Sequence, residues 1–375
     1  MDISIIIPTY NEGTNVQTMV SRLTKVILPL NRTFEILFMD DSTDDTPQQL
    51  GALSEKYPFV NYIHRVDMRG LASAVTDGLK NARGSILIVM DSDLQHPPEL
   101  IPDLLNKINE GYQMVIPSRF IAGGNDGGLN YYRKLVSWTA RIIARLTLKR
   151  LRKTTDPTSG FFAVRKSALE GKEFHPIGWK IMLEIIVRAN IDQIAEIPYH
   201  FQARDLGSSK MNAAEQLKYL IHLFKLILES EEDRRFYLFC LVGSSGVVIN
   251  LLVYKLMLSM GMPIMYAFLI SSLISILSNY LLNNAFTWRM RHKRKSRFSW
   301  FERMVKYVIV SIASLCVSSG VLSSAHYLLH LSPMLSGMTG IAASVIINFV
   351  VNDKWTFTTS KKNLSDKTVM QHVEK

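Results

Sequence analysis

Short apolar runs alternate with amphipathic stretches along the chain as far as Ser230. Each run ends at polar or turn-forming residues, which is typical of buried strands in an α/β protein. The predicted strands are Ser4–Ile7, Glu35–Met39, Val60–His64, Ile86–Met90 and Met114–Pro117. Helical periodicity predicts helices near Val16–Val26, Pro47–Lys56, Leu71–Asn81 and Glu99–Asn109. This alternation predicts a parallel sheet with helices on both faces.

From Phe236 onward the pattern changes to long apolar runs with few charged residues. Four runs follow one another, at Phe236–Leu258, Ile264–Thr287, Val305–Leu329 and Leu335–Phe357. Each run is long enough to cross a hydrocarbon core, which takes about 20 helical residues. Buried core helices are the alternative, but four such runs in succession favour a membrane domain. The predicted fold class is therefore a Rossmann-like α/β domain followed by an all-α transmembrane domain of four helices.

The apolar half contains an internal repeat. The second run ends in Asn279-Tyr-Leu-Leu-Asn-Asn-Ala-Phe-Thr-Trp288, and the fourth ends in Asn348-Phe-Val-Val-Asn-Asp-Lys-Trp-Thr-Phe357. The matching asparagine, threonine and aromatic positions indicate a two-span unit that is used twice. We expect domains at residues 1–232 and 233–360, with a tail at 361–375.

The formal net charge of +11 is unevenly distributed along the chain. A basic segment, Arg289–Arg297, joins the second and third apolar runs, and Lys361-Lys362 follows the fourth. The connectors near Ser259–Pro263 and His330–Pro333 contain no lysine or arginine. By the positive-inside rule, we expect a multi-pass membrane protein whose N-terminal domain, basic segment and tail are cytoplasmic. A basic segment between two spans favours attraction to anionic lipid over binding of nucleic acid.

Two segments of the N-terminal half have amphipathic patterns. Leu129–Leu151 mixes aromatic, aliphatic and basic side chains, and Ala213–Leu228 places large apolar residues at helical spacing. Such helices suit a membrane surface. Ordinary helices docked on the sheet are the alternative, and the four apolar runs favour the interfacial role.

A pair of acidic residues marks the end of one predicted strand. Asp91 and Asp93 follow Ile86–Met90 directly, Gln95 comes next, and Pro97-Pro98 ends any simple continuation of the strand. Open α/β sheets bind ligands at this end of their strands. Paired carboxylates with an amide oxygen suit Mg²⁺ or Mn²⁺, and these ions suit phosphates. For these residues alone, a solvated acidic turn would be the favoured alternative.

Seven motifs that occur in a fixed order give the chain a family resemblance. They are Pro8–Glu12, Asp40–Thr46, Arg69–Ala74, Asp91–Gln95, Ser118–Phe120, Asp156–Phe161 and Phe201–Lys210. With them the chain resembles the family 2 glycosyltransferases of GT-A fold, of the dolichol-phosphate mannose synthase type. The apolar half resembles the GtrA-like membrane domain. The resemblance implies inverting, metal-dependent transfer of a hexose, with mannose favoured, from GDP-mannose to a polyprenyl or dolichyl monophosphate at the cytoplasmic face.

The resemblance also implies a role for each site residue. The expected nucleotide-sugar site comprises Pro8, Tyr10, Glu12, Asp40, Asp41, Ser92, Arg204 and Lys210. The expected ligands of Mg²⁺ or Mn²⁺ are Asp91, Asp93 and Gln95. The acceptor phosphate is expected at Arg119, Arg133 and Ser137, because guanidinium groups pair well with phosphate oxygens. Asp91, Asp93, Arg119 and Arg133 form the expected catalytic set. A general base is not needed, because the attacking phosphate oxygen is already ionised.

Three alternatives to this function remain at the level of sequence. The same chemistry with UDP-glucose is one, since related lipid-phosphate glucosyltransferases share the early motifs. The chain also departs from the mannose-type pattern at Phe162 and Ser209. A lipid-sugar flippase with a regulatory transferase-like domain is the second, although the acidic and arginine sets favour an enzyme. A processive polysaccharide synthase is disfavoured, because no Gln-x-x-Arg-Trp segment occurs.

Overall fold

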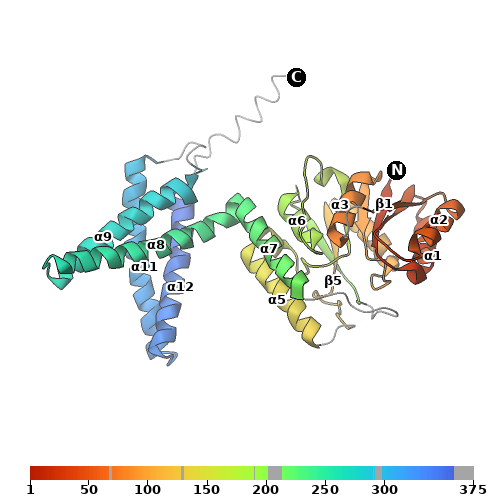
Figure 1. Ribbon diagram of the computed structural model, residues 1–375. Coiled ribbons are helices and arrows are strands. Elements are labelled where there is room, and N and C mark those ends of the chain that lie inside the picture. Colours follow the sequence, from red (N-terminus) through yellow and green to blue (C-terminus); the bar gives the residue numbers. More distant parts are fainter. Residues whose placement is uncertain are drawn as a thin grey trace, which may run out of the picture. The chain divides into compact units, whose positions relative to one another are not determined.

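The computed structural model describes residues 1–66, 70–127, 131–189, 191–201, 213–289, 291 and 298–358, without the side chains of Tyr132, Arg133 and Ala213. The chain forms two compact units, Met1–Ser230 and Glu231–Lys375. We call these the N-terminal unit and the C-terminal unit (Figure 1).

The N-terminal unit is built on a seven-stranded sheet with the order β3-β2-β1-β4-β6-β5-β7. The strands are β1 (Ile3–Thr9), β2 (Phe34–Asp40), β3 (Val60–His64), β4 (Ile86–Val89), β5 (Met114–Ser118), β6 (Phe162–Arg165) and β7 (Ile194–Pro198). All neighbouring strands are parallel except at β6, which is antiparallel to both β4 and β5. The five predicted strands, which correspond to β1 to β5, therefore run in the same direction as expected, whereas β6 and β7 were not predicted from the sequence. Because β6 runs antiparallel to β5, the chain enters β6 at the carboxyl ends of the parallel strands.

Helices cover both faces of this sheet, as predicted. One apolar core packs α1 (Gly13–Ile27), α2 (Thr46–Lys56) and α4 (Ile101–Asn109) against one face. The other core packs α3 (Leu71–Asn81), α5 (Tyr131–Thr147), α6 (Ile181–Arg188) and α7 (Ala213–Glu229) against the opposite face. Single 3-10 turns lie at Leu28–Leu30, Pro98–Leu100, Lys149–Lys153 and Lys166–Ala168.

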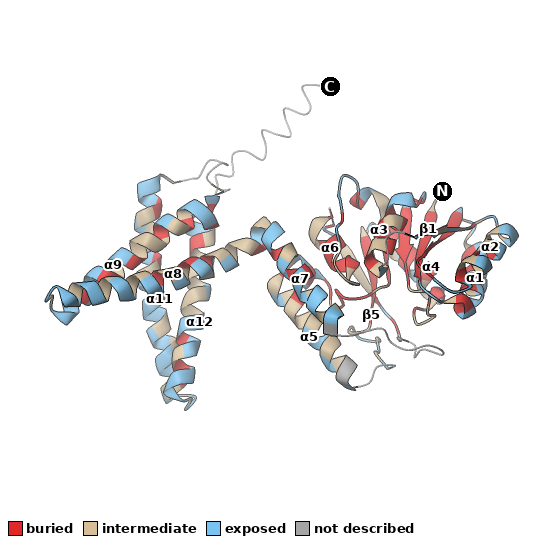
Figure 2. Ribbon diagram, viewed as in Figure 1, coloured by how far each residue is buried: buried red, intermediate tan, exposed pale blue. Residues whose placement is uncertain are grey.

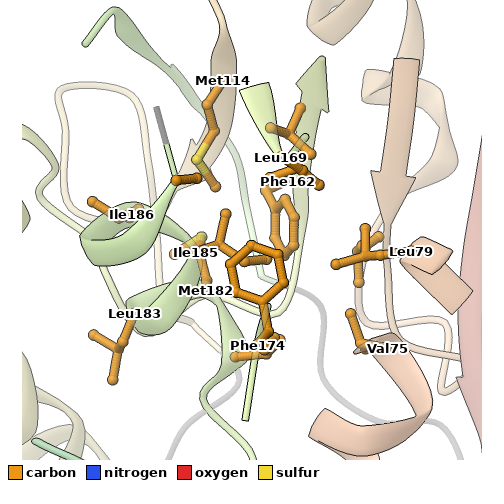
Figure 3. Packing of buried hydrophobic residues seen from close by; sticks show 14 of the residues in the cluster. Val75, Leu79, Met114, Phe162, Leu169, Phe174, Met182, Leu183, Ile185 and Ile186 are labelled. Carbon is orange, nitrogen blue, oxygen red and sulfur yellow. The ribbon is translucent and has the colours of Figure 1, made fainter. Parts of the chain in front are cut away.

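Alternate residues of the strands supply the two cores, because successive side chains of a strand point to opposite faces. In β1, Ile5 belongs to the core under α1 and Ile6 to the core under α3. In the second core, Phe162 and Phe174 fill the space between Val75 on α3 and Met182 on α6 (Figure 3). The strands β1, β2, β4 and β5 are wholly buried as a result, whereas the edge strands β3 and β7 are partly exposed (Figure 2).

The helices α5 and α7 lie side by side and keep large apolar side chains on their outer surfaces (Figure 1). The Tyr219 hydroxyl of α7 donates to the Ala140 carbonyl of α5 at 2.6 Å, which joins the two helices. The exposed large apolar side chains of the pair are Tyr131, Leu135, Trp138, Leu146, Leu217, Leu220, Ile221, Phe224 and Leu228. Monomeric soluble proteins rarely leave such a stripe uncovered.

The described residues of the C-terminal unit form four long apolar helices, each sufficient in length and composition to cross a membrane. They are α8 (Glu231–Ser259), α9 (Ile264–Leu282) with a π turn at Asn283–Thr287, α11 (Trp300–Tyr327), and α12 (Pro333–Val351) with a π turn at Asn352–Thr356. The two π turns occupy equivalent positions of the sequence repeat. Trp288 and Phe357, which are also equivalent, stack with ring centroids 4.2 Å apart. The two copies of the repeat therefore contact each other through equivalent residues.

Two helical glycines provide a matched test of how tightly α3 packs on the sheet. A Cβ at Gly78 in α3 would lie 2.3 Å from Ile6 Cγ2, whereas one at Gly51 in α2 would have its nearest neighbour at 3.5 Å. We expect Gly78→Ala to destabilise the protein by about 1–3 kcal/mol through overpacking. Gly51→Ala should stabilise it by up to about 1 kcal/mol, because alanine is the better helix former. The midpoint of thermal unfolding of the detergent-solubilised chain measures both, and equal shifts would contradict this packing.

Candidate active site

Two loops at the carboxyl ends of β1 and β2 are fastened to each other. Asn11 has a positive φ of 54°, and its backbone N–H donates to Ser42 Oγ at 2.7 Å. Its side-chain oxygen accepts from the backbone N–H of Thr43 at 2.8 Å. Asparagine tolerates this left-handed conformation better than most residues. The loops therefore form one surface beside Tyr10, which is exposed, and Glu12, which is partly buried.

The predicted donor-binding aspartates at the end of β2 are both buried and engaged with the protein. Asp40 Oδ2 lies 2.7 Å from His64 Nδ1, and its Oδ1 accepts from the backbone N–H of Ser42. Asp41 pairs with Arg65 at 3.0 Å and accepts from the backbone N–H of Gly70 at 2.8 Å. These contacts hold the ends of β2 and β3 and the start of α3 in place. A role for either carboxylate at the base or ribose remains a prediction.

The acidic segment after β4 also lies at the carboxyl ends of the parallel strands. The Asp91 side chain is 32% exposed, and its backbone N–H donates to His96 Nδ1 at 3.1 Å. Asp93 Oδ1 accepts from the backbone N–H of Gln95 at 3.2 Å, and Ser92 is buried. Leu94, between the two, has a positive φ of 60°. The segment is thus a tight turn that carries two carboxylates at a partly open edge.

The donor atoms of this turn fit a hard divalent cation. Across the described residues, no three histidine, cysteine, aspartate or glutamate side chains are grouped to enclose a metal. Mg²⁺ is commonly held by one or two carboxylates together with substrate phosphates, and it does not require such an enclosure. Asp91, Asp93 and the Gln95 amide offer oxygen atoms only, which favours Mg²⁺ or Mn²⁺ over softer metals.

A buried ion pair follows the next strand along the chain, β5. Arg119, directly after β5, donates through Nε and Nη2 to the two carboxylate oxygens of Asp156 at 2.8 and 3.0 Å. The Arg119 side chain is 10% exposed and that of Asp156 is fully buried. Burial alone would lower the pKa of Arg119, but Asp156 outweighs it and raises this pKa above its usual value. Arg119 is therefore a fixed, charged group with one edge of its fork taken by Asp156.

The loop between Asp156 and β6 brings this ion pair close to the acidic turn. A Cβ at Gly160 would lie 3.0 Å from Asp91 Oδ2, so only glycine leaves this carboxylate undisturbed. Thr154 and Thr155 fasten the same loop to Glu196 of β7 with hydrogen bonds of 2.7 Å. The loop that leads into β6 thus carries the partner of Arg119 at one end and lies against the Asp91 carboxylate at Gly160.

Three neighbours of this centre were not predicted from the sequence. Lys180 donates to the Thr158 carbonyl at 2.8 Å, and burial together with the positive charge of Arg119 lowers the pKa of its amine. His96 stacks on Phe161 with ring centroids 5.2 Å apart. Burial raises the pKa of Tyr199, whose ring lies 6.3 Å from that of His96. The segments that contain Lys180 and His96 show no repeated spacing or motif that would have identified them as neighbours of the site.

An apolar cavity of about 350 Å³ opens between α5 and α7. Leu135, Ala140 and Ile143 of α5 and Tyr219 of α7 contribute to its wall. The predicted acceptor residue Ser137 also lines it, as does Lys180. The cavity therefore extends from the polar centre toward the exposed apolar stripe of the two helices.

Three predicted site residues cannot be placed in full. Arg204 and Lys210 lie outside the described residues. Arg133 lies in the first turn of α5, but its side chain is outside the described part of the structure. Their roles remain predictions.

Comparison with known proteins agrees with the two-unit architecture. Residues 4–171 match the glycosyl transferase family 2, and residues 238–365 match the GtrA/DPMS transmembrane domain. The chain is 37% identical over 365 residues to a dolichol-phosphate mannosyltransferase of Pyrococcus furiosus, which covers 96% of this chain and 100% of that protein. A dolichol-phosphate mannosyltransferase of Saccharomyces cerevisiae is 34% identical over 238 residues, or 60% of this chain and 87% of that protein.

Among solved structures, glucosyl-3-phosphoglycerate synthase from Mycobacterium tuberculosis in complex with Mn²⁺, uridine diphosphate and glucosyl-3-phosphoglycerate is similar to the N-terminal part. It covers 61% of this chain and 79% of that chain, with 21% identity and a TM-score of 0.46.

The sheet, the motifs and the apolar helices define a glycosyltransferase of GT-A fold that continues into a multi-pass membrane domain of GtrA type. Within that class, the chain belongs to the dolichol-phosphate mannosyltransferase family. The predicted family, fold class and enzyme class are confirmed.

The ion pair between Arg119 and Asp156 can be tested against an exposed pair of lysine and aspartate. We expect Asp156→Asn to destabilise the protein by about 3–5 kcal/mol, because it leaves a buried guanidinium without its counter-charge. Asp192→Asn removes the partner of Lys153, whose pair is 41% and 87% exposed. That change should cost less than about 1 kcal/mol. Thermal unfolding in detergent compares the two, and similar losses would refute a structural role for the buried pair.

Proposed function

We propose that the protein transfers mannose from GDP-mannose to a dolichyl or polyprenyl monophosphate, with a divalent metal ion and inversion at the anomeric carbon. The observation that carries this proposal is that the charges of Asp91 and Arg119 both act on Lys180, which lines an apolar cavity between α5 and α7. The names of the relatives from Pyrococcus furiosus and Saccharomyces cerevisiae support the sugar and the lipid acceptor.

The donor diphosphate would lie at the carboxyl ends of β1, β2 and β4. Tyr10 and Glu12 border the base, while Asp91, Asp93 and Gln95 would hold Mg²⁺ or Mn²⁺ against the diphosphate. The bound ion supplies a Lewis acid that neutralises the negative charge of the departing diphosphate. Gly160 keeps the Asp91 carboxylate in place for this task, because its missing side chain leaves the space that the carboxylate occupies.

The acceptor would approach from the side of the cavity. One oxygen of its phosphate forms the new bond to the anomeric carbon as the bond from that carbon to the diphosphate oxygen breaks, so GDP leaves. That oxygen is ionised at neutral pH and needs no base. Arg119, held in orientation by Asp156, can direct its remaining N–H groups toward the acceptor phosphate. Lys180 and Ser137 line the route that the first prenyl units would take.

The membrane placement follows from the same surfaces. The exposed apolar stripe of α5 and α7 suits the bilayer surface, where the phosphate of a prenyl lipid lies. The basic segment Arg289–Arg297 favours a cytoplasmic position for the ends of the spans that it joins, and hence for the N-terminal unit.

An assay with each nucleotide sugar decides between mannose and glucose as the transferred sugar. Full-length protein with Mg²⁺, a polyprenyl phosphate and labelled GDP-mannose should form a mannosyl lipid, while UDP-glucose in the same assay should form none. The extracted lipid is resolved by thin-layer chromatography and mass spectrometry. A glucosyl product with UDP-glucose and no product with GDP-mannose would replace mannose by glucose. No lipid product from either donor would contradict the lipid acceptor.

The metal assignment can be tested by substituting two aspartates, one in the proposed site and one outside it. We expect Asp93→Ala to lower turnover by more than about a hundredfold, since even supporting groups of metal ligands typically contribute ten- to a hundredfold. Asp103→Ala removes an exposed carboxylate from α4 and should leave turnover unchanged. Electron paramagnetic resonance with Mn²⁺ reports binding directly and independently of turnover. Normal Mn²⁺ affinity in Asp93→Ala would refute this ligand.

A further inference from the structure

A second polar centre lies in the C-terminal unit and includes none of the residues assigned to the transfer reaction. A cavity of about 710 Å³ is present where α8 begins and α9 ends. Four arginines line it, namely Arg234, Arg235, Arg289 and Arg291, together with a single acid, Glu231. A cavity of this size and charge at the end of membrane-spanning helices suggests an anionic ligand.

One nearby carboxylate is shared between two of these arginines. Asp353 Oδ2 lies 3.2 Å from Arg291 Nη2, and its Oδ1 lies 3.5 Å from Arg235 Nε. Asp353 also accepts from Trp288 Nε1 at 3.0 Å. The buried Nε of Arg235 makes no hydrogen bond within the described residues. The four arginines of the lining therefore outnumber Glu231 and Asp353, and an anion in the cavity would balance the excess of positive charge.

The walls of the cavity change from charged to apolar along α8. Glu231, Arg235, Leu238 and Val242 recur at helical spacing and so lie on one face of this helix. Leu241 lies roughly 10 Å further along the helix axis than Arg234. Leu241 is 68% exposed, and Phe286, which also lines the cavity, is 60% exposed. The cavity thus matches an amphiphile with a charged head and a hydrocarbon tail.

We propose that this cavity binds the phosphate group of a membrane lipid, with the hydrocarbon chain along Leu238 and Leu241. Arginine forks match phosphate oxygens in pairs, and the cavity lies at the end of the candidate spans, where lipid phosphates are found. A soluble phosphate would use the arginines but would leave the apolar wall uncovered. The site is separate from the proposed acceptor site, since it shares no residue with Arg119, Arg133 or Ser137.

The proposal can be tested with a double variant of the full-length protein in detergent. Arg234→Gln/Arg289→Gln removes two arginines of the cavity and spares the pair that is tied to Asp353. Lys255→Gln/Lys354→Gln removes the same charge from exposed positions outside the lining. We expect the arginine variant to bind phosphatidylglycerol at least about tenfold more weakly than the wild type, with little change in the lysine variant. Native mass spectrometry measures the lipid-bound fraction. Equal affinities in the two variants would overturn the proposal.

Competing ligands that lack either the phosphate or the hydrocarbon chains show which part of the lipid the cavity recognises. Polyprenyl phosphate should compete with phosphatidylglycerol, because both combine phosphate with long apolar chains. Glycerol 3-phosphate, which lacks the chains, and diacylglycerol, which lacks the phosphate, should compete poorly. Effective competition by glycerol 3-phosphate would make this a site for free phosphate and would refute the lipid assignment. Effective competition by diacylglycerol would refute the role of the arginines.

A second measurement uses the unaltered chain and does not depend on the folding of any variant. A phosphatidylglycerol that carries a photoreactive group in its acyl chain should crosslink to α8 near Leu238–Val242 and to Phe286. Peptide mapping locates these crosslinks. Crosslinks spread evenly over the four apolar helices would show nonspecific solvation by lipid and would overturn the proposal.

Discussion

The buried ion pair between Arg119 and Asp156 is the interaction on which the candidate active site depends. It joins the end of β5 to the loop before β6, and the same loop places Gly160 against Asp91. Two charges that are removed from water are costly unless they are paired with good geometry, and here both carboxylate oxygens accept from the same guanidinium. The pair therefore fixes the distance between the part of the site that would hold the donor diphosphate and the part that would hold the acceptor phosphate.

Much of this architecture could be predicted from local patterns. The strand Ile86–Val89 could be predicted because a buried strand is a short apolar run. The four apolar helices could be predicted because their length matches the thickness of a membrane. The strand β6 was not predicted, since a segment as short as Phe162–Arg165 has no clear periodicity and no local signal for the direction of its neighbours. A structure was needed to place it between β4 and β5.

The site residues divide in the same way. Asp91 and Asp93 could be predicted because they are adjacent in sequence and follow a strand. The partner of Arg119 lies 37 residues away, and the sequence contains no local signal for such a contact. Lys180 likewise has no local sequence signal. It lies directly before α6, and the packing of this helix on the sheet places it. The chemistry was therefore visible in motifs, while the electrostatic environment of each motif was not.

The insertion of β6 has a consequence for the order in which the protein can fold during synthesis. The strands β1 to β4 are neighbours in the sheet and can pair as soon as they are made, but β4 then has an open edge. β5 cannot cover this edge, because its neighbours are β6 and β7. The sheet closes only after α5 and the following loop have been synthesised, and pairings between distant segments form slowly. The segments that carry Asp91 and Arg119 are consequently fixed late, so a nascent chain has no assembled candidate site until β6 has left the ribosome.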